Sequence, residues 1–527
     1  MENTTIAIEL LLLAIAMAVV TKYIRLPYTT ALVICGLAVG ITHFLPIRIE
    51  RDLILMVFLP PLLFEGALNM DLDLLKEQWL PVLLYALVGT VLGAAIIGGL
   101  LWLLTPLPFL YALFLGTILS ATDPVSVLAM FKQYGVEKRL AIVLEGESVF
   151  NDGIAVVLYL VMYGIVKEGG HVPTAGQALG EAGLIAGGGA AVGLVVGWVA
   201  YRALKRIDDH LLEVMISVVL AWGAYLLAER FHMSGVLATA CAGLIIGNFG
   251  RYFAMSPTTR VTLNSFWEVA AFIANSFVFI LIGVQIEGAS FARHGWAMVA
   301  AVLAVVVSRG AVVYGLAPVL RLGGWRFPLS WQHVMNVGGL RGSIPIALVL
   351  GLPAAMADRE LFLTAVFGVV FFSLVVQGLA IKPLLSRLGL IGLDARQLEF
   401  ETKLGRAMSL KSALRELKEL AEDGEVSPPL FERISREIQK EKEDISREIG
   451  VLQEQHDFLR DGEERRVMRR LLHARRSAVE DVFRRGVISE PALDEIRREI
   501  DALAADLSEG GPRPSGRSEG SETGDRA

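Results

Sequence analysis

Apolar runs of about twenty residues follow one another from the N-terminus to about residue 383, and they limit what this chain can fold into. A helix of about twenty residues spans the roughly 30 Å hydrocarbon layer of a membrane. The sequence therefore predicts an all-α membrane protein with thirteen transmembrane helices. The predicted spans are 5–22, 28–45, 51–68, 79–104, 109–130, 139–165, 181–204, 211–229, 235–249, 264–286, 296–320, 333–352 and 361–385.

The composition changes near residue 390, beyond which Glu, Arg and Lys dominate and apolar positions become sparse. We expect a transmembrane antiporter-like domain over 1–390 and a cytosolic helical tail over 391–507. The stretch 508–527 is rich in Gly, Ser and charge and is predicted to be disordered. Repeated Arg and Glu pairs in the tail are typical of solvated helix faces joined by ion pairs. A bundle that makes dimer contacts or binds a regulator and a passive bundle both fit this pattern.

Lys and Arg are unequally distributed between the two sets of alternate loops. The loops richer in positive charge are expected to face the cytoplasm. With an odd number of spans, the N-terminus then lies outside and the tail inside a multi-pass protein of the plasma membrane. The first apolar run lacks a basic flank and a small-residue cleavage motif, so we interpret it as a retained span rather than a signal peptide.

Two of the predicted spans contain proline beside a charged residue. The fifth run holds Ser120–Pro124 with Asp123, and the twelfth holds Gly338–Pro345 with Arg341. Proline removes a backbone donor and clashes with the preceding turn, so each helix should be interrupted. Irregular backbone at membrane depth persists only against protein or a water-filled cavity. Because the two runs hold matching positions in two halves, we expect an inverted repeat whose two broken helices cross at the midplane.

Asp123 and Asp152 place two carboxylates inside apolar runs. An ionised carboxylate at the centre of a membrane costs roughly 2.5–3.5 kcal/mol even on the gentler scales. Ser148 lies three residues before Asn151 and four before Asp152, so the three side chains are predicted to share one helical face. A hard cation such as Na+ requires several oxygen ligands. Asp123, the hydroxyl of Thr122 and freed backbone carbonyls would complete an oxygen cage with Asp152 and Ser148.

Proton coupling follows from the same carboxyl group. Removal from water disfavours the ionised form of an acid. A proton and a metal cation would then compete for Asp152, and such competition is the requirement for antiport. The alternative is that Asp152 pairs with a cation elsewhere and only holds helices together. For Asp123 the alternative is a cap on the exposed amides of a half-helix.

The basic residues inside the spans need partners as well. Glu147 and Arg309 form a natural structural ion pair, because neither would stay buried alone. Arg341 would neutralise Asp123 or the C-terminal ends of half-helices at the crossing. Glu65 lies near a span end, where it either lines a cavity or reaches the membrane interface.

Other classes of protein lack support in the sequence. No phosphate-binding loop of the form G-x-x-x-x-G-K-[ST] is present, so the sequence gives no support for an ATP-driven pump. Cys35 and Cys241 lie in apolar runs with small neighbours, and we expect buried thiols rather than a disulfide or a metal site. No cofactor and no nucleic-acid partner are expected. The two acids lack the G-x-G-D context of intramembrane aspartyl proteases, so we expect no enzyme. A cation channel or uptake carrier is the alternative to an antiporter.

Five motifs resemble, in order and spacing, those of the sodium/proton exchangers of the monovalent cation:proton antiporter-1 family. They are Phe58–Ala67, Ala121–Val125, Gly146–Gly153, Val307–Arg309 and Gly338–Ser343. The resemblance covers nearly all of residues 1–390. It implies a thirteen-helix inverted-repeat fold, a homodimer in the membrane lipid and an elevator-like movement of a core domain, in a bacterial member with a long cytosolic tail.

The resemblance also implies roles for single residues. Asp152 matches the ion- and proton-binding acid, with Asp123, Ser148 and the carbonyl of Thr122 nearby, and Glu65 matches a position that contributes directly or through water. Relatives with the Asn151–Asp152 pair exchange electroneutrally, and one titrating acid likewise favours one cation per proton. We expect exchange of Na+, with Li+ or K+ as alternatives, for H+. The predicted ion- and proton-binding residues are Asp152, Asp123, Ser148, Thr122, Asn151 and Glu65. The Na+ site itself is predicted at Asp152, Asp123, Ser148 and Thr122. Structural roles are predicted for Glu147, Arg309 and Arg341.

Overall fold

The structure is a computed structural model of the chain. It describes residues 2–455 apart from 25–26, 42–52, 169–173, 208, 252–254, 285–287, 326, 354, 357 and 391–394, and it also describes scattered residues between 467 and 503. The chain divides into two compact units, Met1–Gly392 and Leu393–Ala527. The predicted disordered stretch 508–527 lies outside the described residues.

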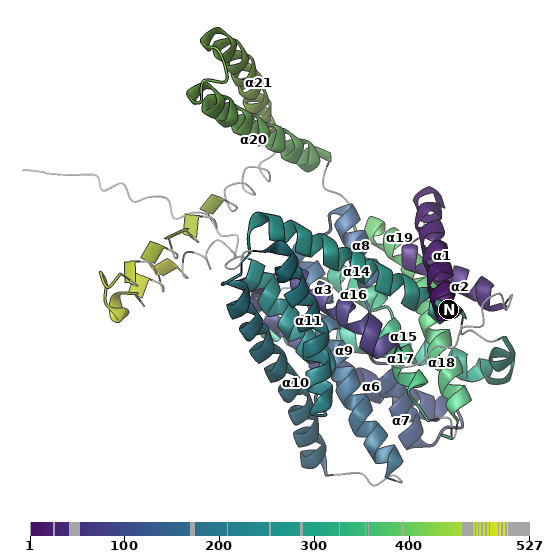
Figure 1. The fold of residues 1–527 in the computed structure, drawn as a ribbon. Helices are drawn as coiled ribbons and strands as arrows, with labels where there is room; N and C mark the ends of the chain where they lie inside the picture. The colour runs from purple at the N-terminus through teal and green to yellow at the C-terminus, as the bar shows by residue number, and fades with distance from the viewer. Residues whose placement is uncertain are drawn as a thin grey trace, which may run out of the picture. The chain divides into compact units, whose positions relative to one another are not determined.

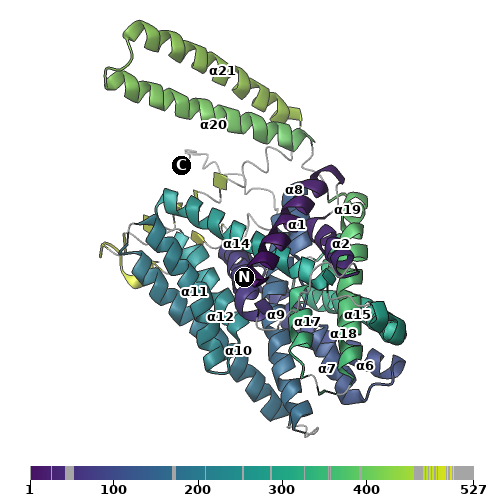
Figure 2. The same ribbon diagram turned by 45° about the vertical axis from the view of Figure 1, so that its right-hand side comes forward.

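Every regular element of the described part of the first unit is helical (Figures 1 and 2). Several helices contain a π-helical turn, a local widening that is frequent at functional sites. The elements are α1 (Glu2–Ile24), α2 (Tyr28–Ile41), η1 (Leu53–Phe58), α3 (Leu59–Asn69), α4 (Leu72–Glu77), α5 (Trp79–Leu83), η2 (Leu84–Gly89), α6 (Thr90–Leu104), α7 (Phe109–Ile118), α8 (Val125–Tyr134), α9 (Lys138–Lys167), α10 (Ala175–Leu204), α11 (His210–Arg230), α12 (Gly235–Ile245), η3 (Ile246–Gly250), α14 (Pro257–Val284), α15 (Gly288–Leu322), α16 (Leu329–Gly338), α17 (Ser343–Leu350), α18 (Arg359–Phe372), η4 (Ser373–Gln377) and α19 (Gly378–Arg387), where η marks the π-helical turns.

Eight helices of the described residues are long and apolar enough to cross a membrane. Four shorter apolar helices accompany them: Tyr28–Gly40, Leu55–Asn69, Phe109–Ile118 and Gly235–Gly250. For the described residues, the predicted all-helical fold is confirmed by these elements. The count of thirteen spans stays a prediction.

Small residues let the helices of this unit approach closely. A Cβ at Gly36 in α2 would overlap the backbone carbonyl of Ile280 in α14, and a Cβ at Gly283 would overlap that of Val33. Such small-residue contacts replace the hydrophobic driving force that is missing between helices in lipid. α10 and α11 lie side by side at one edge of the unit (Figures 1 and 2).

Two helices are interrupted where proline and a charged residue occur together. The chain unwinds between α7 and α8 and again between α16 and α17. The two unwound stretches meet, because the backbone N–H of Asp123 donates to the carbonyl oxygen of Leu340 over 2.7 Å. Backbone groups that lose their helical partners at membrane depth need such replacements. The interruptions predicted from the sequence are therefore present, and they contact each other.

The second unit begins with two helices, α20 (Ala395–Glu422) and α21 (Pro428–Gln455), that pack against each other. Gly424 lies in the connecting turn with a left-handed backbone (φ 78°). Lys403 of α20 pairs with Glu448 of α21 and, over 3.4 Å, with Glu399 of its own helix. The hydrogen bond to Glu448 raises the pKa of Lys403, and the same bond lowers the pKa of Glu448. Ion pairs between the tail helices were expected from the sequence, and this is one of them.

Candidate functional site

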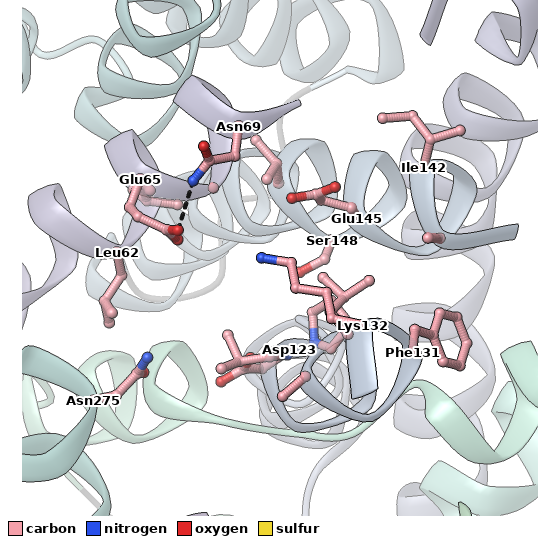
Figure 3. Close-up of a pocket in the computed structure, with 18 of the residues that line it drawn as sticks. Leu62, Glu65, Asn69, Asp123, Phe131, Lys132, Ile142, Glu145, Ser148 and Asn275 are labelled. Carbon is pink, nitrogen blue, oxygen red and sulfur yellow. Dashed lines mark hydrogen bonds between the residues drawn. The ribbon is translucent and has the colours of Figure 1, made fainter. Parts of the chain in front are cut away.

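A cavity of about 820 Å³ opens within the first unit, with walls from α3, α8, α9 and α14 (Figure 3). Its charge is strongly one-sided, because six carboxyl groups and two amino groups line it. A cleft lined by one sign of charge concentrates counter-ions, so this cavity attracts cations. The charged lining residues are Glu65, Asp71, Asp123, Lys132, Lys138, Glu145, Asp152 and Glu268.

Asp123 reaches the cavity from the unwound stretch before α8. Its Oδ1 accepts a hydrogen bond from the backbone N–H of Val125 over 3.0 Å, and the side chain is half-buried. A carboxylate at the N-terminus of a helix is stabilised by the exposed amides there. The same side chain therefore bonds the first amide of α8 and lines the cavity, and its role as an ion ligand stays a prediction.

Asp152 and Ser148 reach the cavity from α9. The hydroxyl of Ser148 donates to the backbone carbonyl oxygen of Thr122 over 2.7 Å, which ties α9 to the unwound stretch. Asp152 is half-buried on the same wall. Thr122 and Asn151 are buried and do not line this cavity. Of the six predicted ion-binding residues, the structure gathers Asp123, Ser148, Asp152 and Glu65 around one space.

Glu65 lies on the opposite side of the cavity, in α3. It accepts a hydrogen bond from Asn69 Nδ2 over 2.7 Å, and Asn69 Oδ1 in turn accepts one from Arg251 Nη2 over 3.1 Å (Figure 3). Each bond restricts the next side chain, so the amide of Asn69 fixes the carboxylate of Glu65. The structure places Glu65 on the cavity wall, the first of its two predicted positions.

Five of the eight charged cavity residues were not predicted as site residues: Asp71, Lys132, Lys138, Glu145 and Glu268. Glu145 is in α9, and Lys132 is in the last turn of α8; in Figure 3 both side chains point into the cavity. Glu145 had a detectable signal, because it lies three residues before Ser148 and seven before Asp152, on the same helical face. Lys132 had none, since only the fold brings α8 across from α3.

Glu147 and Arg309 form a buried, bidentate ion pair between α9 and α15. Arg309 Nη2 donates to Glu147 Oε2 over 2.9 Å, and Nη1 donates to Oε1. Arg309 also donates from Nε to the carbonyl oxygen of Met335 over 3.1 Å. Glu147 is 1% exposed and Arg309 is 6% exposed, so water cannot replace either partner.

Arg341 occupies the point where the two unwound stretches meet. Its Nη1 donates to the carbonyl oxygens of Ser120 and, over 2.7 Å, Ala121, which the unwinding after α7 leaves without helical partners. Its backbone N–H donates to Ser373 Oγ over 2.8 Å. Arg341 was expected either to neutralise Asp123 or to bind the C-terminal ends of half-helices. These bonds fit the second role.

The family of the chain follows from comparison with known proteins. The family model described as "Sodium/hydrogen exchanger, transmembrane" matches residues 10–387. The chain is 36% identical over 510 residues to the Na+/H+ antiporter NhaG of Bacillus atrophaeus, which covers 93% of this chain and 95% of NhaG. It is 39% identical over 413 residues to the Na+/H+ antiporter NhaH of Halobacillus dabanensis, covering 72% and 97% of the two chains.

A solved structure shares the fold. The sodium proton antiporter MjNhaP1 of Methanocaldococcus jannaschii, determined at pH 8, superimposes with a TM-score of 0.59 at 22% identity and covers 71% of this chain and 99% of its own. The fold that the two chains share is that of an all-helical membrane protein. The chain belongs to the sodium/hydrogen exchanger family, as the resemblance of its five motifs predicted. The family is one of transporters, in agreement with the expectation that the chain is no enzyme.

Proposed function

We propose that this protein exchanges Na+ for H+ across the plasma membrane, with Li+ or K+ as alternative cations. The observation that carries the proposal is the convergence of Asp152, Asp123 and Ser148 on one acidic cavity inside a chain of the exchanger family. Carboxylate and hydroxyl oxygens are the ligands that hard cations prefer. The transported ions are substrates, and no resident cofactor enters the proposal.

Asp152 is the group for which the two ions compete. A carboxyl group that binds Na+ as a carboxylate must lose its proton first, and protonation releases the cation. Ser148 supports the arrangement, because its bond to the Thr122 carbonyl joins Asp152's helix to the stretch that carries Asp123. Thr122 thus enters the site through its backbone, while Glu65 faces the same cavity from α3.

Transport further requires that the site open to each side in turn. We propose that the thirteen spans form an inverted repeat with the meeting point of the broken helices near the midplane; the bond between Asp123 and Leu340 supports this crossing. The unequal loop charges support an outside N-terminus and a cytoplasmic tail. From the motif resemblance we also propose a homodimer with elevator-like movement. The tail as a regulator-binding element, with no nucleic-acid partner, stays a prediction.

The direct test of exchange uses the full chain in proteoliposomes with a preformed acidic interior. Addition of Na+ should dissipate the pH gradient, and clamping the membrane potential at different values should leave the rate unchanged, because one cation moves for each proton. Li+ and K+ are measured in the same way. A cation channel, the alternative function, would instead conduct Na+ at constant pH and respond to the potential. Current without proton flux would replace the antiporter proposal with the channel.

The close approach between Gly342 and Asp123 gives a second test. A Cβ at Gly342 would overlap the carboxyl group of Asp123, so Gly342→Ala must displace this carboxyl group from its place on the cavity wall. We expect exchange to fall by about tenfold or more, since each lost 1.4 kcal/mol of binding is a factor of ten. Gly164→Ala in α9 is the control, because a Cβ there meets no atom within 4 Å. Equal rates for both variants and the unchanged protein would argue against a role for Asp123.

A further inference from the structure

A second, much smaller cavity is lined by none of the described residues that line the acidic one. Its volume is about 10 Å³, and its wall is made by η2, α6, α9, α15 and the two unwound stretches. This space is close to the smallest that holds one water molecule. Its lining is polar, and the side chains that matter here are Thr90, Asn151, Ser308, Arg309 and Arg341.

Two buried polar atoms on this wall have no hydrogen-bond partner among the described residues: Asn151 Oδ1 and Arg341 Nε. Asn151 is 2% exposed and Arg341 is 3% exposed, so bulk water does not reach them. One atom is an acceptor and the other carries an N–H donor. Buried polar groups are rarely left unpaired, because each unpaired group costs free energy.

The other polar groups of this wall use their donors elsewhere. The guanidinium of Arg309 is bound to Glu147 and Met335, Ser308 Oγ donates to the carbonyl oxygen of Gly93 over 3.1 Å, and Thr90 donates to Ala86. Both hydroxyl oxygens keep a lone pair that can accept a hydrogen bond. The hydroxyl of Ser120, which donates to the carbonyl oxygen of Thr117 over 2.7 Å, is a further acceptor, so the cavity offers one strong donor and up to four acceptors.

We propose that this cavity binds a single water molecule, which accepts a hydrogen bond from Arg341 Nε and donates one to Asn151 Oδ1. Its second proton goes to the hydroxyl of Ser308 or Thr90. Two guanidinium groups line the wall, so a cation is repelled. A chloride ion needs more room than a water molecule, so the cavity is too small for it. Cavities that stay dry are apolar, whereas this one is lined by polar groups, two of them without a hydrogen-bond partner in the described part of the chain.

The water would join two parts of the proposed exchange site. Asn151 directly precedes Asp152 in α9, and Arg341 binds the carbonyl oxygens of the unwound stretch that leads to Asp123. Asn151 then binds water rather than the transported cation, in keeping with its absence from the wall of the acidic cavity. The proposal does not depend on exchange activity, and its test needs no transport measurement.

The test compares two alanine substitutions in α6, the helix that contributes Gly93 to the wall. A Cβ at Gly93 would lie 3.7 Å from Ser308 Oγ, so it fits without a clash, whereas a Cβ at Gly99 meets no atom within 4 Å. Each substitution improves helix propensity. If the cavity holds water, Gly93→Ala takes its space and should melt lower than Gly99→Ala by roughly 2–4 °C or more in detergent. If the cavity is dry, the methyl group fills a void and Gly93→Ala should melt at least as high, which would overturn the proposal.

A second variant and a map complete the experiment. Asn151→Ala combined with Gly93→Ala should lower the melting temperature no further than the worse single variant, because both lose the same water. Additive losses would contradict the proposal. An electron-microscopy map at about 2 Å should show a peak within hydrogen-bond distance of Asn151 Oδ1 and Arg341 Nε. Empty density there would refute it regardless of the melting data.

Discussion

Vesicles that contain the Asp152→Asn variant should exchange Na+ for H+ at least about 100-fold more slowly than vesicles with the unchanged protein. Asparagine keeps the size of the side chain but can neither carry the proton nor balance the charge of the cation. The loss of one partner from a buried charge interaction costs roughly 2–5 kcal/mol, and each 1.4 kcal/mol is a factor of ten. The measurement is the rate at which Na+ dissipates a pH gradient at equal protein content.

The matched control is Glu168→Gln at the C-terminal end of the same helix, where the side chain is exposed and outside the cavity. This variant loses a carboxyl group directly after α9 without touching the site, so its exchange should equal that of the unchanged protein. Thermal unfolding of all three proteins separates loss of activity from loss of fold. Sodium-dependent proton flux that persists in Asp152→Asn would refute the assignment of Asp152.

Breaking the buried pair of Glu147 and Arg309 should have the largest effect on stability. We expect Glu147→Gln to lower the free energy of unfolding by about 3–5 kcal/mol, because it leaves the guanidinium of Arg309 buried without a counter-charge. The low exposure of both side chains excludes rescue by water. Melting temperature in detergent and the yield of folded protein after size-exclusion chromatography report the loss.

Two controls make this result specific to burial. The surface pair of Arg293 and Glu360 has a similar N–O distance of 3.1 Å, but its side chains are 72% and 63% exposed, so Glu360→Gln should shift the melting temperature little. Replacing both buried partners together, as Glu147→Leu with Arg309→Met, should cost less than Glu147→Gln alone, since no buried charge remains. A double variant less stable than Glu147→Gln would show that the pair itself, and not the orphaned charge, holds the helices.

The sequence predicted those features that depend on local patterns. Runs of apolar residues marked the helices, and Pro124 and Pro345 with their charged neighbours marked the interruptions. The pairing of Glu147 with Arg309 was foreseeable because a buried charge needs an opposite one. Asn69 and Arg251 could not be linked to Glu65 from sequence, since Arg251 lies 182 positions beyond Asn69 and reaches it only through the packing of α3 against α12 and its π-helical extension.

Asn151 does not share the cavity-facing side of α9 with Ser148 and Asp152, although the spacing of three and four residues predicted one common face. An α-helix turns by about 100° per residue, so Ser148 and Asp152 differ by about 40° around the axis, whereas Asn151 and Asp152 differ by about 100°. Ser148 and Asp152 accordingly line the acidic cavity, and Asn151 lines the small one. The same arithmetic places Glu145 about 20° from Asp152, which explains its presence on the wall. The angles around the helix axis therefore distinguish Asn151 from the residues that line the acidic cavity, which spacings of three or four residues do not.

Six carboxyl groups and two amino groups line the cavity, so its lining is acidic. The attraction of this cavity for cations therefore depends on the salt concentration of the medium, more strongly than contacts with the binding atoms alone would. In dilute medium the field of these charged groups extends about 30 Å at 0.01 M salt and draws sodium inward, but in molar brine it reaches only about 3 Å. At low salt, all charged residues of the cavity thus help to attract Na+. In strong brine, binding depends only on the few oxygen atoms that touch the ion.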